Sequence, residues 1–87
     1  MRDVTERRKD RRRSVFLRAE VFAADGSPVT DCAIQDASRS GCRVISDDID
    51  LIPDDIVLTI RGLGETFAGR VVWRKHSEAG VEFISAE

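Results

Sequence analysis

Two groups of polar residues in this sequence have the types and spacing needed to bind an anionic ligand. The first is a run of arginines close to the N-terminus, residues 7–13 (RRKDRRR). Guanidinium groups form forked hydrogen bonds with phosphate oxygens and can also stack on purine faces, which lysine does poorly. The run could therefore hold the phosphates of a ligand, although by itself it could equally serve RNA, a membrane surface or no partner.

The second group has the spacing D-x-S-x-x-G and consists of Asp36, Ser38 and Gly41. A carboxylate can accept two hydrogen bonds from the N1–H and N2–H₂ edge of guanine, and a hydroxyl can donate or accept beside it. A glycine lets a ligand approach the backbone. By itself this string is more typical of a turn that an Asp or Ser side chain stabilises. Together, the two groups suit an anionic ligand that contains guanine.

Other residues that could do chemistry are isolated from one another. The single histidine, His76, falls in a polar segment, and nothing in the sequence places it beside a nucleophile or a metal-ligand set. Cys32 and Cys42 lie ten residues apart, with no second pair and no C-x-x-C. We expect them to be two buried small side chains in a reducing cytoplasm. We therefore expect no enzyme, no metal site and no cofactor.

Length and charge narrow the class of protein. Eighty-seven residues, 41% of them hydrophobic, supply one modest core and exclude the large enzyme folds. Residues 1–14 hold seven basic and three acidic residues, a net charge of +4, whereas residues 15–87 hold seven basic and thirteen acidic residues, a net charge of −6. This asymmetry indicates an anionic partner for the basic segment and argues against DNA or RNA binding by the acidic body.

The body has the pattern of short β-strands separated by turn signals. We expect strands at residues 15–23, 29–36, 42–46, 56–62, 65–75 and 80–84, with an acidic connection over residues 47–55 and a bulge or close approach at Gly69. Six antiparallel strands favour an all-β closed barrel, because closure removes exposed edges.

The expected organisation is a flexible basic arm, residues 1–14, followed by a barrel domain, residues 15–87. The arm contains one apolar residue after the first methionine and cannot bury a face. No apolar leader and no long apolar run occur, so we expect a cytoplasmic protein without membrane insertion.

The combination of motifs resembles the PilZ domain family of cyclic di-GMP receptors. An Arg-x-x-x-Arg pair precedes the first expected strand and D-x-S-x-x-G follows the second. The likeness runs from about residue 6 to residue 83, and its last part is GRVVW (69–73) followed by GVEF (80–83). It implies a six-stranded antiparallel barrel. Many members add a helix after the last strand, which we do not expect here.

The resemblance also implies roles for the arginines. The pair is Arg8 and Arg12, because E-R-R-x-x-x-R is the commoner family arrangement, or Arg7 and Arg11, which have the same spacing. In the first register Arg7 is an auxiliary phosphate contact. Asp10 departs from the family pattern, because it could pair with a neighbouring arginine and weaken the grip on phosphate.

The resemblance assigns base recognition to the second motif. Asp36 and Ser38 would read guanine, and Gly41 completes the motif. Trp73 either lines the ligand face or is an aromatic residue of the barrel core or rim. The implied function is a receptor in which cyclic di-GMP bridges the arm and this turn, and the ordered arm changes the surface shown to a downstream protein partner. The alternative is a PilZ-like interaction adaptor that binds no nucleotide, although intact motifs count against it.

Overall fold

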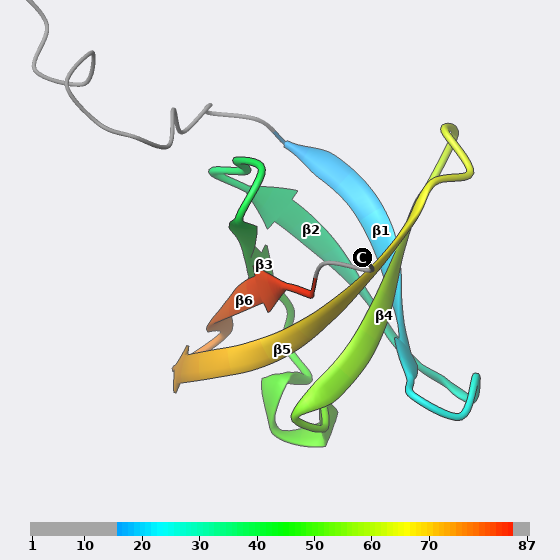
Figure 1. The fold of residues 1–87 in the computed structure, drawn as a ribbon. Coiled ribbons are helices and arrows are strands. Elements are labelled where there is room, and N and C mark those ends of the chain that lie inside the picture. The colour runs from blue at the N-terminus through cyan, green and yellow to red at the C-terminus, as the bar shows by residue number, and fades with distance from the viewer. Residues whose placement is uncertain (1–15, 85–87) are drawn as a thin grey trace, which may run out of the picture.

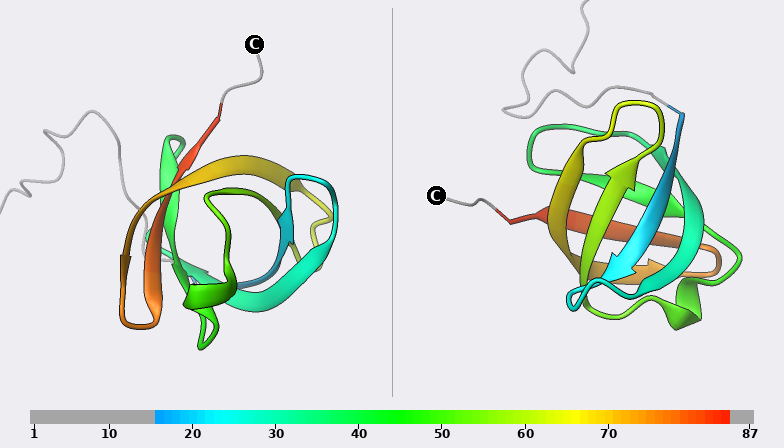
Figure 2. Two further views of the ribbon diagram at one scale, coloured as in Figure 1. Left: turned by 90° about the horizontal axis from the view of Figure 1, so that it is seen from below. Right: turned by 90° about the vertical axis from the view of Figure 1, so that its right-hand side faces the viewer.

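Six antiparallel strands close into a barrel in the computed structural model, which describes residues 16–84 (Figure 1). The strands are β1 (Leu17–Ala23), β2 (Pro28–Gln35), β3 (Gly41–Ile45), β4 (Asp55–Ile60), β5 (Thr66–Lys75) and β6 (Glu78–Phe83). Their order around the ring is β1-β2-β3-β6-β5-β4, and β4 pairs with β1 to close it (Figure 2). The all-β barrel predicted from the sequence is confirmed, and each predicted strand overlaps an observed one.

The core follows from alternation along the strands, whose side chains point in turn into and out of the barrel. Val21, Val44 and Leu58 are its largest fully buried side chains. Cys32 and Cys42 are buried free thiols, as predicted. Burial raises the pKa of Cys32 to about 11 and that of Cys42 to about 12. Both thiols are therefore neutral at neutral pH and pack as small apolar groups.

The connection between β3 and β4 is more ordered than predicted. The acidic connection predicted over residues 47–55 is observed, and a 3-10 turn, η2 (Ile49–Leu51), forms within it. It buries Ile49, and Ile52 follows it into the core. Arg74 of β5 holds this segment, since its guanidinium donates to the carbonyl oxygen of Ile52 at 2.7 Å and pairs with Asp54 at 2.8 Å. The 3-10 turn and its buried isoleucines were not predicted, because two isolated isoleucines in an acidic stretch have no periodicity.

The segment around η2 lies at one end of the barrel, which we call the far end. The opposite end carries four chain segments. β1 begins at this end and β2 ends there, since Leu17, the first residue of β1, pairs with Ile34 near the end of β2. The turn between β2 and β3, the turn between β4 and β5, and the end of β6 lie at the same end (Figure 1). We call it the open end.

The predicted division between residues 14 and 15 lies outside the described residues. Within residues 16–84, no helix is long and apolar enough to cross a membrane.

Two glycines permit close contact between β6 and its neighbours. A Cβ atom on Gly41 would overlap the carbonyl oxygen of Val81, and one on Gly69 would lie 2.5 Å from the Cγ1 atom of Val81. Gly69 is therefore the close-approach position that the sequence predicted. The irregularity of β5 lies instead between Val71 and Trp73, where the register with β6 shifts.

We predict that Gly41→Ala lowers the free energy of unfolding by roughly 1–3 kcal/mol, as overpacking does. Its new methyl would meet backbone, which cannot move without disturbing the β3–β6 ladder. Gly69→Ala should cost less, because its nearest obstacle is a side-chain methyl that can shift. Urea unfolding of both variants measures the difference. Destabilisation by Gly69→Ala equal to or larger than that by Gly41→Ala would show that strand packing does not explain Gly41.

Candidate functional site

The D-x-S-x-x-G segment forms a tight turn between β2 and β3, which we call the 36–41 turn. Asp36 begins it with a positive φ of 54°, a conformation that Asp tolerates better than most residues. The amide of Ser38 donates to the carbonyl oxygen of Gly41 at 2.8 Å, and the amide of Ser40 donates to the Ser38 hydroxyl at 3.2 Å. These bonds give the turn its own structure, so Asp36 and Ser38 sit on a defined backbone.

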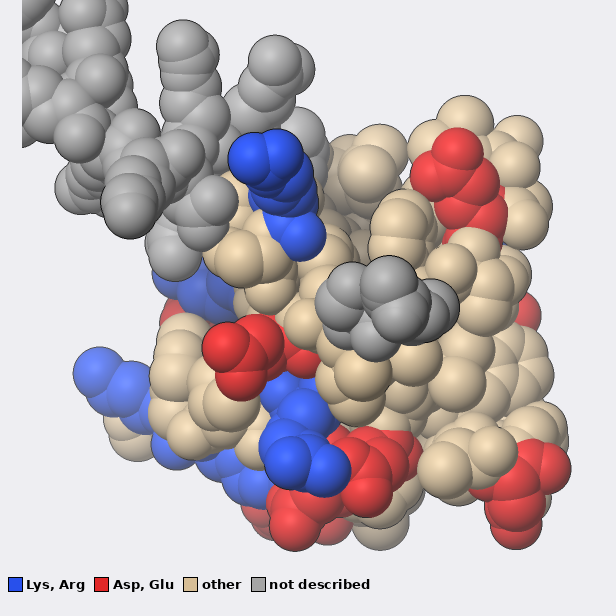
Figure 3. Space-filling view, viewed as in Figure 1, with Lys and Arg blue, Asp and Glu red and all other residues tan. Residues whose placement is uncertain are grey.

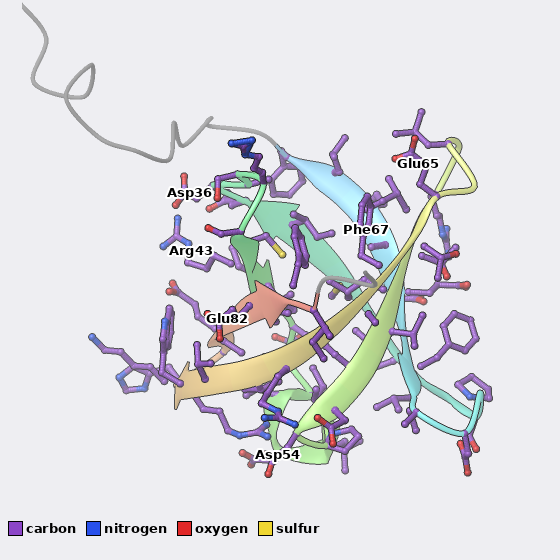
Figure 4. The ribbon with its side chains drawn as sticks, viewed as in Figure 1. Asp36, Arg43, Asp54, Glu65, Phe67 and Glu82 are labelled. Atoms are coloured by element: carbon purple, nitrogen blue, oxygen red, sulfur yellow. The ribbon has the colours of Figure 1, made fainter. Side chains whose placement is uncertain are left out.

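Arg43 fixes the carboxylate of Asp36 from the adjacent strand. Its Nη2 atom lies 2.7 Å from Oδ2 of Asp36 and donates to the side-chain oxygen of Gln35 at 2.9 Å. Its Nη1 atom lies 3.3 Å from Oε1 of Glu78 on β6. Figure 4 shows Asp36 and Arg43 on the same side of the barrel. One guanidinium thus joins the end of β2 to the start of β6, and orients Asp36 in doing so.

The 36–41 turn forms one wall of a pocket of about 540 Å³ on the side of the barrel, which we call the lateral pocket. It is lined by Asp36, Ser38, Ser40, Gly41, Cys42, Arg43, Val72, Trp73, Gly80, Val81 and Glu82. Four residues that the sequence singled out, Asp36, Ser38, Gly41 and Trp73, are therefore brought together. The other four, Arg7, Arg8, Arg11 and Arg12, lie outside the described residues.

Trp73 belongs to the wall opposite the turn. A Cβ atom on Gly80 would overlap the Trp73 indole, so the glycine provides the space in which the ring lies. The register shift in β5 sets this pairing, because it places Trp73 directly opposite Gly80. Trp73 remains 44% exposed. Trp73 is thus not a core residue, and its position in the pocket wall fits both a ligand face and the barrel rim.

The geometry gives Gly41 a role different from the one its motif suggested. Its missing side chain is required by the backbone of β6, which passes where a Cβ atom would stand. The amide of Phe83 also donates to the carbonyl oxygen of Ser40 at 2.8 Å, tying the turn to the end of β6. Packing within the barrel is therefore sufficient to explain a glycine at position 41.

The charge of the lateral pocket restricts the ligands that the pocket can bind by itself. Its one basic residue is Arg43, which is already paired with Asp36 and Glu78. Residues 16–84 together hold seven basic and twelve acidic residues, a net charge of −5. On the face that Figure 3 shows, acidic and basic side chains lie side by side at the lower edge. The described residues thus offer groups that can bind a base, but no unpaired cation beside them in the pocket.

Sequence reasoning missed Arg43, Gly80 and Glu82 as pocket residues. Arg43 could have been found by extending the β2–β3 pairing, because Gln35 lies opposite Arg43 and Asp36 comes next in the chain. His76 is exposed in the turn between β5 and β6, and no group of three His, Cys, Asp or Glu residues among residues 16–84 could hold a metal ion.

We predict that Arg43 and Asp36 are coupled by about 0.5–1 kcal/mol in a double-mutant cycle of Arg43→Met and Asp36→Ala. The two side chains are only one third exposed, so solvent screens the pair incompletely. Arg70 and Asp55, which are 61% and 56% exposed at 3.1 Å, form a control pair whose coupling should be smaller. Urea unfolding supplies the free energies. Equal coupling in both pairs would mean that Arg43 does not hold the turn.

Comparison with protein families agrees with the barrel fold. The family model of the PilZ domain matches residues 6–87, which is nearly the whole chain. No curated protein matches the sequence. PilZ domains are cyclic di-GMP-binding domains that act as binding and adaptor modules and are not known as catalysts. From the extent of this match, the chain belongs to the PilZ domain family.

Proposed function

We propose that this domain is a cyclic di-GMP receptor whose lateral pocket binds a guanine base and whose N-terminal arginines bind the phosphates. The observation that carries the proposal is the chemistry of the pocket. It gathers a carboxylate, a hydroxyl and an aromatic ring around about 540 Å³, yet its single cation is already paired. A dianionic ligand at this pocket needs cations from elsewhere, and the run of arginines at residues 7–13 is the richest source in the sequence.

The pairing of Asp36 with Arg43 is compatible with base recognition. Each carboxylate oxygen has two lone pairs, so the Asp36 carboxylate can accept from Arg43 and from the N1–H and N2–H₂ groups of guanine together. The Asp36 side chain is 34% exposed and so can be reached. Arg43 then acts as a positioning residue that presents the carboxylate in one orientation. Trp73 offers an aromatic face on the opposite wall, where a base could pack.

The path of the chain supports a role for the arginines. The segment before Phe16 joins the barrel beside the end of β2, because Leu17 pairs with Ile34, two residues before Asp36. Arg12 precedes Phe16 by four residues, a span of at most about 14 Å. Arg8 and Arg12, or Arg7 and Arg11, can therefore approach the 36–41 turn without rearrangement of the barrel. Binding of the phosphates would order residues 1–14 and present a new surface to a protein partner.

A second candidate function is a PilZ adaptor that binds no nucleotide. One observation favours it: Asp36 is engaged by Arg43, and the Ser38 hydroxyl accepts from the amide of Ser40. Both motif side chains already have a structural use inside the turn. In an adaptor, the 36–41 turn would serve only to join β2 and β3, and the surfaces around it would contact proteins.

We predict that the full chain binds cyclic di-GMP more tightly than cyclic di-AMP by about 2 kcal/mol or more, a factor of roughly 30. The physical reason is that adenine lacks the N1–H and N2–H₂ donors that the carboxylate of Asp36 accepts. Isothermal titration calorimetry with both nucleotides measures the difference directly. GTP serves as a further control, since it carries guanine without the cyclic phosphodiester.

Asp36→Ala should remove this discrimination, whereas Asp55→Ala, at the far end of the barrel, should leave it unchanged. Equal affinity of the unaltered chain for the two cyclic dinucleotides would contradict the role of Asp36. Absence of heat with every nucleotide, from a protein that circular dichroism shows to be folded, would favour the adaptor.

A further inference from the structure

The two ends of the barrel differ in how they are closed. At the far end, Ile49 and Ile52 of the segment around η2 fill the interior. At the open end, the described residues supply no such closure and leave a hollow of about 510 Å³, which we call the open-end hollow. Phe67 and Phe83 stack within it, with ring centroids 5.2 Å apart. Figure 4 shows Phe67 on the stretch of β5 near this end.

Large apolar side chains on the rim of this hollow are exposed to solvent. Leu63 is 63% exposed, Ile84 is 50% exposed and Leu17 is 37% exposed, and all three line the hollow. An exposed apolar rim around an apolar depression is typical of a surface that binds another molecule.

The composition of the chain argues against its own terminal segments as the occupant of the open-end hollow. The segments outside the described residues are 1–15, whose apolar residues after Met1 are Val4 and Val15, and 85–87, which read SAE. Neither stretch has the large side chains needed to fill about 510 Å³ beside two phenylalanines. An occupant with leucine and isoleucine at its surface fits better, and the rim itself has both.

The rim of the hollow carries one cation and one anion. Arg39, in the 36–41 turn, and Glu65, in the turn before β5, both line the hollow, and neither has an ion-pair partner among residues 16–84. The strand order puts the β2–β3 turn and the β4–β5 turn on opposite sides of the barrel, with β1 between them on one side and β6 on the other. A cation and an anion thus face each other across one apolar depression.

We propose that the open end is the interface of a symmetric homodimer, in which two barrels meet end to end. A twofold axis in the plane of the interface, running from β1 to β6, brings the β2–β3 turn of one copy over the β4–β5 turn of the other. Arg39 of each copy then faces Glu65 of its partner, so the contact forms twice. The apolar rims meet at the same time, and Leu63 of each copy packs against the hollow of the other.

Sedimentation velocity of the full chain over a range of concentrations tests this arrangement. We expect a concentration-dependent dimer for the unaltered chain and a monomer for Leu63→Asp. Leu51→Asp is the matched control, because Leu51 is 64% exposed on η2 at the far end, and it should dimerise like the unaltered chain. A chain that stays monomeric at all concentrations, or equal weakening by Leu51→Asp and Leu63→Asp, would overturn the proposal.

A charge exchange separates the proposed geometry from any other apolar contact. Arg39→Glu alone and Glu65→Arg alone should each weaken the dimer on the order of tenfold, since each places like charges together twice in the dimer. The two changes combined should restore dimerisation, because the pairs re-form with opposite sign. Failure of the double variant to recover, while circular dichroism shows it folded, would mean that Arg39 does not face Glu65.

Discussion

The ion pair between Arg43 and Asp36 is the interaction on which the candidate site depends. Asp36 leaves β2 with a positive φ, and the chain then turns within six residues into β3. Arg43 reaches back across this turn to Asp36 and Gln35, and across to Glu78 on β6. Three strands are thereby joined at one guanidinium. The position of the carboxylate is set by the barrel, so the site would be preorganised for a hydrogen-bonding partner.

The ion pairs of Arg43 with Asp36 and Glu78 also neutralise the one positive charge of the lateral pocket. A guanidinium that balances two carboxylates contributes little net attraction to a phosphate. The barrel over residues 16–84 is acidic, and four of its seven basic residues, Arg43, Arg61, Arg70 and Arg74, are in ion pairs. On the proposed function, recognition of the base and attraction of the phosphates fall to different parts of the chain. That division would account for a strongly basic segment before an acidic domain.

Alternation of apolar residues predicted the barrel correctly, because one buried face enforces a two-residue period in every strand. Features that depend on register were harder to predict. The contact of Trp73 with Gly80 requires an irregularity in β5, and the sequence around Val72 carries no signal for it. Burial of Ile49 and Ile52 at the far end of the barrel was not predicted, because both residues lie within an acidic stretch. Asp36 and Ser38 were chosen by motif, whereas Arg43, which holds Asp36, could be recognised only through the pairing of β2 with β3.

On the proposed function, the barrel provides the base-binding groups and the N-terminal arginines provide the cations. Backbone ¹⁵N relaxation of the full chain, recorded without and with saturating cyclic di-GMP, tests it most directly. The account predicts higher heteronuclear NOE values for residues 6–14 on binding and shifted amide signals in the 36–41 turn, with the rest of the barrel little changed. Shifts in the turn with no change in the relaxation of residues 6–14 at saturation would contradict it.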